Sequence, residues 1–401
     1  MDESHTQTQI QVVVESPKLI INNDTALNLH NNNNNVKTKS SSTKQPILSS
    51  ILTKFHAGYF RISMSLCSQA LLWKILVEPN DDVHSLRQVF RLVPSTAFNF
   101  LWSLALFTLV LQSLLYILRC LLHFQMVKTE FLHQVGVNYL FAPWISWLLL
   151  LQSSPFVTPN TLYYQVFWWV FVVPIVVLDV KIYGQWLTKG KRFLATVANP
   201  TSQLSVIGNL VAARAAAEMG WKETAVCMFS LGIAHYLVVF VTLYQRLSGD
   251  NALPAMLRPV FFLFIGAPSV ASLAWCSISG KFDIASKMFF FLSLFLFMSL
   301  VARPELFRKS MKKFHVTWWA YSFPLSLLAL AAIKYAEEVK GGIAHALMVV
   351  LSALSVLVCV VLIAVTAVNS NILLPPSSTS STTRSNTKTS SISSTSRCDS
   401  R

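Results

Sequence analysis

Long apolar runs alternate with short polar segments over most of this 401-residue chain. Each run comes close to the ~20 residues that cross the ~30 Å hydrocarbon core of a bilayer. The pattern therefore predicts an all-α polytopic membrane protein with ten transmembrane helices. The predicted spans are 55–77, 97–122, 136–152, 162–180, 203–217, 225–246, 260–278, 284–302, 316–333 and 342–368.

The two ends of the chain have a different composition. Residues 1–50 are polar and include a run of asparagines from Asn31 to Asn35, and residues 371–401 are rich in serine and threonine. Neither segment carries enough apolar side chains to form a core, so we expect two disordered tails around a transmembrane domain at 51–370. The N-terminal tail lacks the short apolar stretch of a cleaved signal peptide, so the first span is expected to target the chain.

Basic residues between the spans predict the orientation. With the N-terminus inside, the inner loops hold thirteen lysines and arginines and the outer loops hold seven. Cytoplasmic loops carry the excess of Lys and Arg in membrane proteins. Both termini are therefore predicted to be cytoplasmic.

Helix-breaking residues are concentrated in the odd-numbered spans. They are Gly58, Pro143, Gly208, Pro268 and Pro324. Irregular backbone at membrane depth is tolerated where it faces protein or water rather than lipid. We therefore expect five helical hairpins around a central pore, with the odd helices as an inner ring whose kinks line the pore and the even helices outside. The alternative is that glycine and proline are simply common in membrane helices.

Phe323 is the sharpest candidate for a functional residue. It directly precedes Pro324, whose ring forces a kink and leaves a carbonyl without its helical partner. The kink would aim Phe323 into the pore, where an aromatic ring can block passage or meet an anion with its positive edge. The simpler interpretation is an aromatic side chain that packs beside a kink.

Composition and charge narrow the class of function. The chain is 53% hydrophobic and 12% charged, has a mean hydropathy of +0.52, and carries a net charge of +15 that is spread through short loops. This distribution fits membrane topology and anion attraction better than nucleic-acid binding. The phosphate-binding, metalloprotease and serine-hydrolase motifs are absent, and the six cysteines form no Cys-x-x-Cys pair, so we expect no enzyme, cofactor or metal site.

Four polar residues in or beside the spans have two interpretations each. Arg214 and Glu218 are four residues apart and share a helix face, as a self-neutralising pair or as an anion-attracting group at an outer pore mouth. Lys181 closes the fourth span, where it attracts anions or extends its ammonium to the interface. His235 lies inside the sixth span, as a proton relay or as a structural hydrogen-bonding residue.

Seven short motifs together carry a family resemblance. One is Trp318-Trp319-Ala320-Tyr321-Ser322-Phe323-Pro324, and the others are 68–73, 181–186, 198–200, 234–247, 267–269 and 299–303. Over roughly residues 50–370 the chain resembles the plant slow-type anion channels of the plasma membrane and, more distantly, the bacterial tellurite-resistance protein TehA. The resemblance implies five hairpins around a pore, usually in a trimer, with chloride, nitrate and in some members malate as permeant ions. By the Tyr-x-Phe-Pro motif it makes Phe323 the residue that occludes the pore, with Gly58 as its partner.

The resemblance leaves three functions open. The first is a passive anion channel. The second is a proton-coupled carrier of malate or sulfite, for which His235 is the best candidate. The third is an electrically silent subunit that assembles with longer family members. Kinase-regulated members have a long N-terminal region, whereas about fifty residues precede the first span here, so Ser40 to Ser42 and Ser385 are weak candidates for phosphorylation.

Overall fold

A computed structural model describes residues 47–77, 95–133, 135–247, 255–312 and 314–369. Every regular element in this part of the chain is a helix. The predicted boundary of the N-terminal tail at residue 50 falls inside the first helix, Ile47–Lys54. The rest of both predicted tails, with the candidate phosphorylation sites, lies outside the described residues.

The helices follow the predicted order of spans. The α-helices are α1 (Ile47–Lys54), α2 (Arg61–Val77), α4 (Ser95–Leu122), α5 (Phe124–Leu132), α6 (Gly136–Tyr139), α7 (Phe141–Ser153), α8 (Leu162–Val197), α9 (Gln203–Glu218), α10 (Lys222–Leu247), α11 (Leu263–Ser279), α12 (Ile284–Val301), α13 (Glu305–Arg308), α14 (Trp319–Val339) and α15 (Gly342–Val368). The 3-10 turns are η1 (Ala57–Phe60), η2 (Pro200–Ser202), η3 (Ala255–Phe262), η4 (Ser310–Lys312) and η5 (Val316–Trp318).

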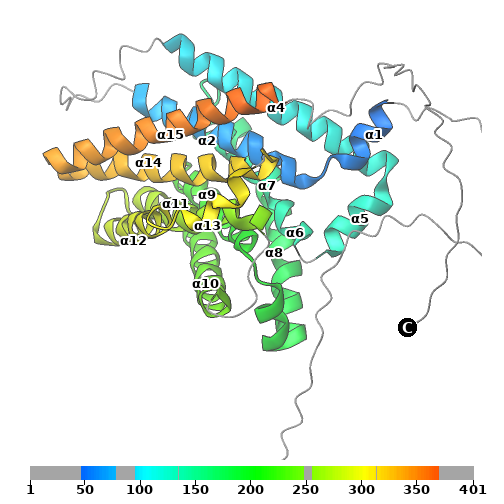
Figure 1. The fold of residues 1–401 in the computed structure, drawn as a ribbon. Helices are drawn as coiled ribbons and strands as arrows, with labels where there is room; N and C mark the ends of the chain where they lie inside the picture. The colour runs from blue at the N-terminus through cyan, green and yellow to red at the C-terminus, as the bar shows by residue number, and fades with distance from the viewer. Residues whose placement is uncertain (1–46, 78–94, 134, 248–254, 313, 370–401) are drawn as a thin grey trace, which may run out of the picture. The chain divides into compact units, whose positions relative to one another are not determined.

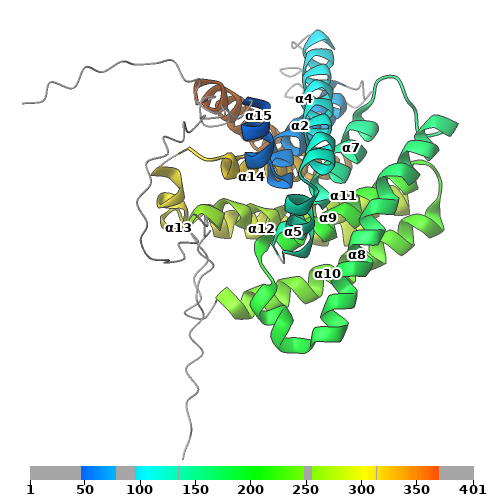
Figure 2. The same ribbon diagram turned by 90° about the vertical axis from the view of Figure 1, so that its right-hand side faces the viewer.

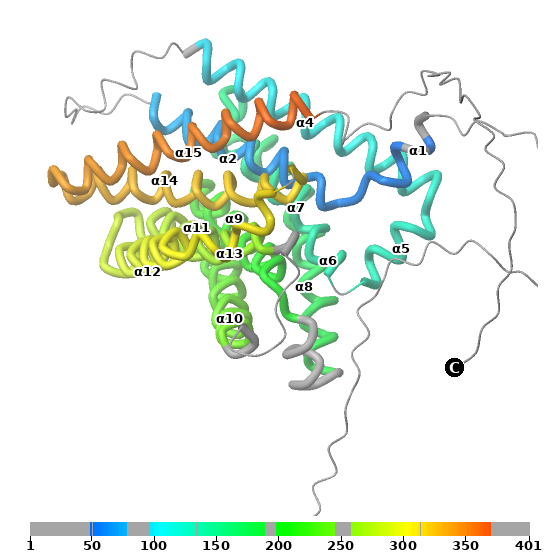
Figure 3. The backbone as a smooth tube through the Cα atoms, viewed as in Figure 1, coloured from blue at the N-terminus to red at the C-terminus, as the bar shows by residue number. Residues whose placement is uncertain are grey.

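Eight helical segments among the described residues are long and apolar enough to cross a membrane, and they match eight of the predicted spans. The predicted third and fifth spans differ. The third is α7, with 13 residues, and the chain bends by 106° between α5 and the segment that leads into α7 (Figure 3). The fifth is α9, with 16 residues. The fourth continues as one helix to Val197, beyond the predicted end at residue 180, because polar residues that favour helix follow the apolar run.

The odd-numbered spans form a closed ring. Going around it, α2 packs on α7, α7 on α9, α9 on α11, α11 on α14, and α14 returns to α2. The even-numbered spans lie behind them, with α4 on α2, α8 on α7 and α9, α10 on α9, α12 on α11, and α15 on α14. The contact of α14 with α15 and with α2 is visible in two views (Figures 1 and 2). The predicted all-α polytopic fold is confirmed, and among the described residues the contacts put the odd-numbered helices inside and the even-numbered helices outside.

Burial separates the two sets of helices. In the most apolar 18-residue stretch of each span, 94% of residues are buried in Val316–Val339 and 17% in Thr96–Leu122. Large apolar side chains such as Phe107, Phe295 and Val350 remain exposed on the outer helices. Such a surface is stable only where hydrocarbon covers it, so the outer helices face lipid and the inner ones face protein.

Hydrogen bonds join the first hairpin to the last and close the ring. The Gln69 side-chain amide of α2 donates to Ser326 Oγ of α14 at 2.9 Å and to Ser355 Oγ of α15 at 2.7 Å. Ser65 Oγ donates to the Trp319 carbonyl at 3.0 Å. These contacts place Gln69 and Ser326 at the same depth, which fixes the register of α2 against α14.

Candidate pore

Phe323 lies on the face of α14 that points into the ring. Successive residues of a helix are about 100° apart, so Phe323 falls between Ser326, which bonds to α2, and Leu327, which lies 3.7 Å from the Cβ position of Gly266 in α11. α2 and α11 are the two ring neighbours of α14, and their contacts divide the surface of α14 into two sectors. One sector faces the axis of the ring and the other faces outward. Tyr335 stacks on Phe290 of the outer helix α12 in the other sector. Phe323 therefore belongs to the inward sector.

The Phe323 ring is completely buried, with 0% of its surface exposed. Its neighbour Pro324 lies against α11, 3.4 Å from the position that a Cβ would take at Gly266. A missing side chain at Gly266 thus lets the kinked part of α14 approach α11 closely.

The other predicted helix breakers occupy different environments. A Cβ at Gly208 would meet Ile175 of α8 and Phe141 of α7, both at 3.5 Å, so this glycine faces the contact with the neighbouring helices. Pro143 lines an apolar groove of about 710 Å³ that α4, α5 and α8 also border. Pro268 is buried within α11. Gly208 and Pro143 thus contact neighbouring helices, where close helix packing also requires small or kinked residues.

Gly58 lies in η1, the 3-10 turn at the start of the first span that leads directly into α2. A Cβ at this position would lie 2.6 Å from His56 Cε1 and 2.8 Å from Arg61 Nη2. The absence of a side chain therefore lets an imidazole and a guanidinium approach each other at the start of the ring.

Three of the ring helices start in the same way, with a 3-10 turn and a side chain that accepts a hydrogen bond from the backbone N–H two residues later. His56 Nδ1 accepts from Gly58, His315 Nδ1 from Thr317, and Asn199 Oδ1 from Thr201. Such caps satisfy N–H groups that have no helical partner. The five ring helices are connected through outer helices that return the chain, so all of them start at one end, which we call the N-terminal mouth.

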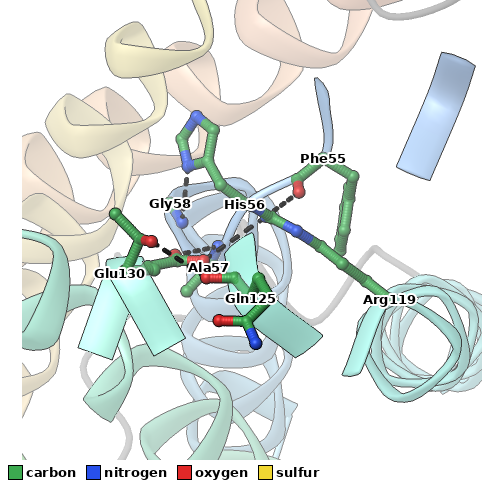
Figure 4. A network of polar contacts seen from close by, with 8 residues as sticks. Phe55, His56, Ala57, Gly58, Arg119, Gln125 and Glu130 are labelled. Atoms are coloured by element: carbon green, nitrogen blue, oxygen red, sulfur yellow. Dashed lines mark hydrogen bonds and ion pairs between the residues drawn. The ribbon is translucent and has the colours of Figure 1, made fainter. Parts of the chain in front are cut away.

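A second contact fixes the start of α2 from outside the ring. Glu130 of α5 accepts a hydrogen bond from the Ala57 N–H at 2.8 Å and pairs with Arg119 of α4 at 3.4 Å (Figure 4). Arg119 also donates to the Phe55 carbonyl. The carboxylate and the guanidinium neutralise each other here, and α5 is thereby tied to the N-terminal mouth.

Arg61, in the first turn of α2, points into the N-terminal mouth. Two residues later Ser63 bonds to Gln112 of the outer helix α4, so Arg61 lies on the opposite face of α2. Its guanidinium lies 4.7 Å from the ring centre of Tyr139, just before α7. Arg61 is 5% exposed, its Nε donates to the Gly58 carbonyl at 2.8 Å, and its buried Nη1 has no hydrogen-bond partner.

The opposite end, the C-terminal mouth, carries three basic residues on three ring helices. Lys74 donates to the carbonyls of Gln152 and Ser154, Arg214 pairs with Glu218 at 3.0 Å, and Lys334 pairs with Glu337 at 2.9 Å. The predicted proximity of Arg214 and Glu218 is thus observed as an ion pair. Along the described ring helices, acidic residues occur only near these C-terminal ends.

Lys181 and His235 lie outside the ring. The Lys181 ammonium lies 3.1 Å from the centre of the Phe131 ring in α5 and donates to the Phe131 carbonyl. His235 of α10 stacks on Trp186 of α8, with ring centres 4.6 Å apart and an angle of 4° between the rings. Both side chains therefore contact neighbouring outer segments, but His235 does so through ring stacking, and its buried Nε2 has no hydrogen-bond partner among the described residues.

Sequence reasoning overlooked Arg61, Lys74 and the two capping histidines. Arg61 is an ionisable residue within an apolar span, which is by itself an indication of function. The sequences Phe55-His56 and Phe314-His315 repeat the same two residues at the start of two odd-numbered spans. That repeat was a usable signal for equivalent helix starts.

A ring of kinked helices with lipid-facing helices around it defines a multi-pass membrane protein. Residues 54–367 match the SLAC1 family, described as voltage-dependent anion channels. The chain belongs to this family.

Three curated relatives from Arabidopsis thaliana are similar over most of the chain. The S-type anion channel SLAH1 is 59% identical over 84% of this chain and 87% of its own length, and the S-type anion channel SLAH4 is 56% identical over 84% and 90%. The guard cell S-type anion channel SLAC1 is 46% identical over 78% of this chain and 55% of its own length.

Proposed function

We propose that this protein is a slow-type anion channel, or a subunit of one, that conducts chloride and nitrate passively across the plasma membrane. The observation that carries the proposal is the position of Phe323, buried on the inward face of α14 in a closed ring. Displacement of this ring would open the passage, and its return would close it. The relatives named S-type anion channels support the same class of function.

Charge supports anions as the permeant species. Arg61 faces one mouth, and Lys74, Arg214 and Lys334 lie at the other, whereas the acidic residues of the ring helices lie only near their C-terminal ends. Basic groups at the entrances of a narrow passage raise the local anion concentration. The excess of basic residues in one set of loops supports cytoplasmic termini. A trimer, or a heteromer with longer relatives, is the assembly that the family resemblance favours, and malate is a further candidate ion.

The proton-coupled carrier is the weaker candidate. Its candidate relay, His235, stacks between two outer helices, α8 and α10, away from the ring. The two functions differ in their reversal potentials. A passive channel follows the equilibrium potential of the anion, whereas a proton-coupled carrier shifts with external pH.

The decisive experiment is Phe323→Ala in a voltage-clamped cell, with surface expression measured in parallel. Removal of the ring is expected to raise the steady anion current roughly tenfold or more, because a hydrophobic constriction is lost. Phe290→Ala is the matched control, since Phe290 is equally buried but packs on Tyr335 outside the passage. It should lower yield without a leak.

A leak in Phe290→Ala as large as in Phe323→Ala, or no leak in Phe323→Ala at the cell surface, would contradict a gate at Phe323. The same recordings, repeated with a longer relative in the same cell, distinguish an independent channel from a silent subunit. A subunit would change the current of its partner and carry none alone.

A further inference from the structure

We propose that Arg61 forms the centre of an anion-binding site at the N-terminal mouth, which holds a small inorganic oxyanion such as nitrate before it reaches Phe323. This inference rests on the proposed conduction of anions, and it adds a residue and a position to it. Four observations carry it: an uncompensated charge, fixed donors around that charge, the depth of the site, and the engagement of the nearby carboxylate.

Among the described residues, the charge of Arg61 has no counter-ion. The ion pairs there form at Arg119, Arg214 and Lys334, and none includes Arg61. A guanidinium stays protonated in proteins, and burial without a partner is strongly unfavourable. Arg61 is 5% exposed and its Nη1 is buried without an acceptor, so an anion from solution would supply the missing partner.

The donors around this space are held in place. The Arg61 guanidinium lies over the Tyr139 ring, 4.7 Å from its centre, and Gly58 leaves room for His56 beside it. The Nδ1 atoms of His56 and His315 both accept backbone hydrogen bonds, so each neutral ring carries its proton on Nε2. Each Nε2–H can then donate to a ligand. A planar guanidinium with further N–H donors suits a planar oxyanion better than a sphere.

The two histidines belong to the same mouth as Arg61. The pKa of His56 is lowered to about 4, by burial first and then by the charges of Arg61, Arg119 and His315. The pKa of His315 is lowered by burial and by Arg61. Both rings lie at starts of ring helices, His56 before η1 and His315 before η5, and burial with the nearby charge of Arg61 keeps both neutral near neutral pH.

The depth of Arg61 puts the site just before the constriction. Gln69 and Ser326 lie at one level, Arg61 precedes Gln69 by eight residues, and Phe323 precedes Ser326 by three. At 1.5 Å per residue, Arg61 lies about 7–8 Å closer to the N-terminal mouth than Phe323. An anion bound at Arg61 would therefore lie between the N-terminal mouth and the Phe323 ring.

The nearby carboxylate has other partners. Glu130 lines the same pocket of about 430 Å³ as His56 and Tyr139, but it accepts from the Ala57 N–H and pairs with Arg119 (Figure 4). Its negative charge is therefore matched by Arg119, and no described carboxylate pairs with Arg61.

The test measures binding rather than current. The purified full-length chain in detergent is titrated with sodium nitrate, with sodium gluconate added to keep ionic strength constant, and thermal stability is recorded. We expect saturable stabilisation of the wild type. Arg61→Gln should weaken the apparent affinity at least roughly tenfold, and Arg61→Lys should fall between, since it keeps the charge but loses the planar fork.

Lys181→Gln is the matched control, a cation at the same end of the helices but outside the ring. It should bind nitrate as the wild type does. Equal nitrate affinity in Arg61→Gln and wild type, or an equal loss in Lys181→Gln, would overturn the proposal. Should Arg61→Gln fail to fold, a structure of the wild-type protein in sodium nitrate provides a second measurement. Nitrate density in contact with Arg61 supports the site, and nitrate bound only elsewhere refutes it.

The experiments can contradict the Arg61 site and the proposed channel independently of each other. Nitrate binding that depends on Arg61 in a chain that carries no current would keep this site and contradict the proposed channel. A leak in Phe323→Ala without Arg61-dependent binding would do the reverse.

Discussion

His56 has three roles at one position: it caps the turn before α2, borders Arg61, and shares the mouth with His315. Its Nδ1 satisfies the Gly58 N–H at 3.0 Å. Asn199 makes the same bond at the start of α9 without an ionisable group. The structural role of His56 can therefore be separated from its charge by a single substitution.

His56→Asn is predicted to flatten the dependence of stability on pH in the acid range. The pKa of His56 is about 4 in the folded chain, where burial and then Arg61 disfavour its charged form, against about 6.5 when unfolded. As pH falls from about 6.5 to about 4, the unfolded state binds the proton first. The contribution of His56 to the free energy of unfolding is therefore fully present above this pH range and is lost within it. The melting temperature of wild type should fall more steeply there than that of His56→Asn. The same dependence of melting temperature on pH in both proteins would contradict a lowered pKa of His56.

Among the elements, the approach of α14 to α11 depends on Gly266. Valine at this position would push against Ile207 and Pro324, whose atoms lie 3.4 Å from the Cβ position. We predict that Gly266→Val destabilises the chain by about 1–3 kcal/mol, as overpacking of a core does. Gly184→Val is the control, since a Cβ at Gly184 meets nothing within 4 Å. Chemical unfolding in detergent would measure both, and equal stability of the two variants would be evidence against close packing at Gly266.

The arrangement of the helices was largely predictable, because the features that indicate it lie within single spans of the sequence. Hydrophobic length identified the spans, and the helix breakers identified the inner ones, because backbone irregularity is costly against lipid. The bend between α5 and α7 was not predictable from the pattern of a single span, and neither was the hydrogen bond from the distant Ala57 N–H to Glu130 of α5. The neighbours of Gly208 and Pro143 were not predictable either. Which neighbour a small residue contacts is decided by tertiary packing, and the pattern within a single span does not contain that information.

For the whole molecule, the unequal charge of the two mouths has consequences for current. Lys334 lies at the C-terminal mouth and is only partly compensated by Glu337 at a half-exposed position. We predict that Lys334→Gln lowers the current of the open Phe323→Ala channel clearly at low salt and little at high salt, because exposed charges are screened within about 10 Å at 0.1 M. Lys222→Gln, at the same end on the outer helix α10, should have a smaller effect. A salt-independent loss in Lys334→Gln would instead indicate a direct binding role.

The contact of α2 with α14 and α15 has a consequence for the synthesis of the protein. Gln69 bonds to partners 257 and 286 positions later in the chain, so the first ring helix enters the bilayer long before they have been translated. Until the final hairpin inserts, its amide has to find temporary partners in the translocation machinery, in water or in a membrane chaperone. A ribosome that stalls before the last two helices would therefore release a product with an open seam and an exposed polar side chain, which the quality-control proteases of the membrane can recognise.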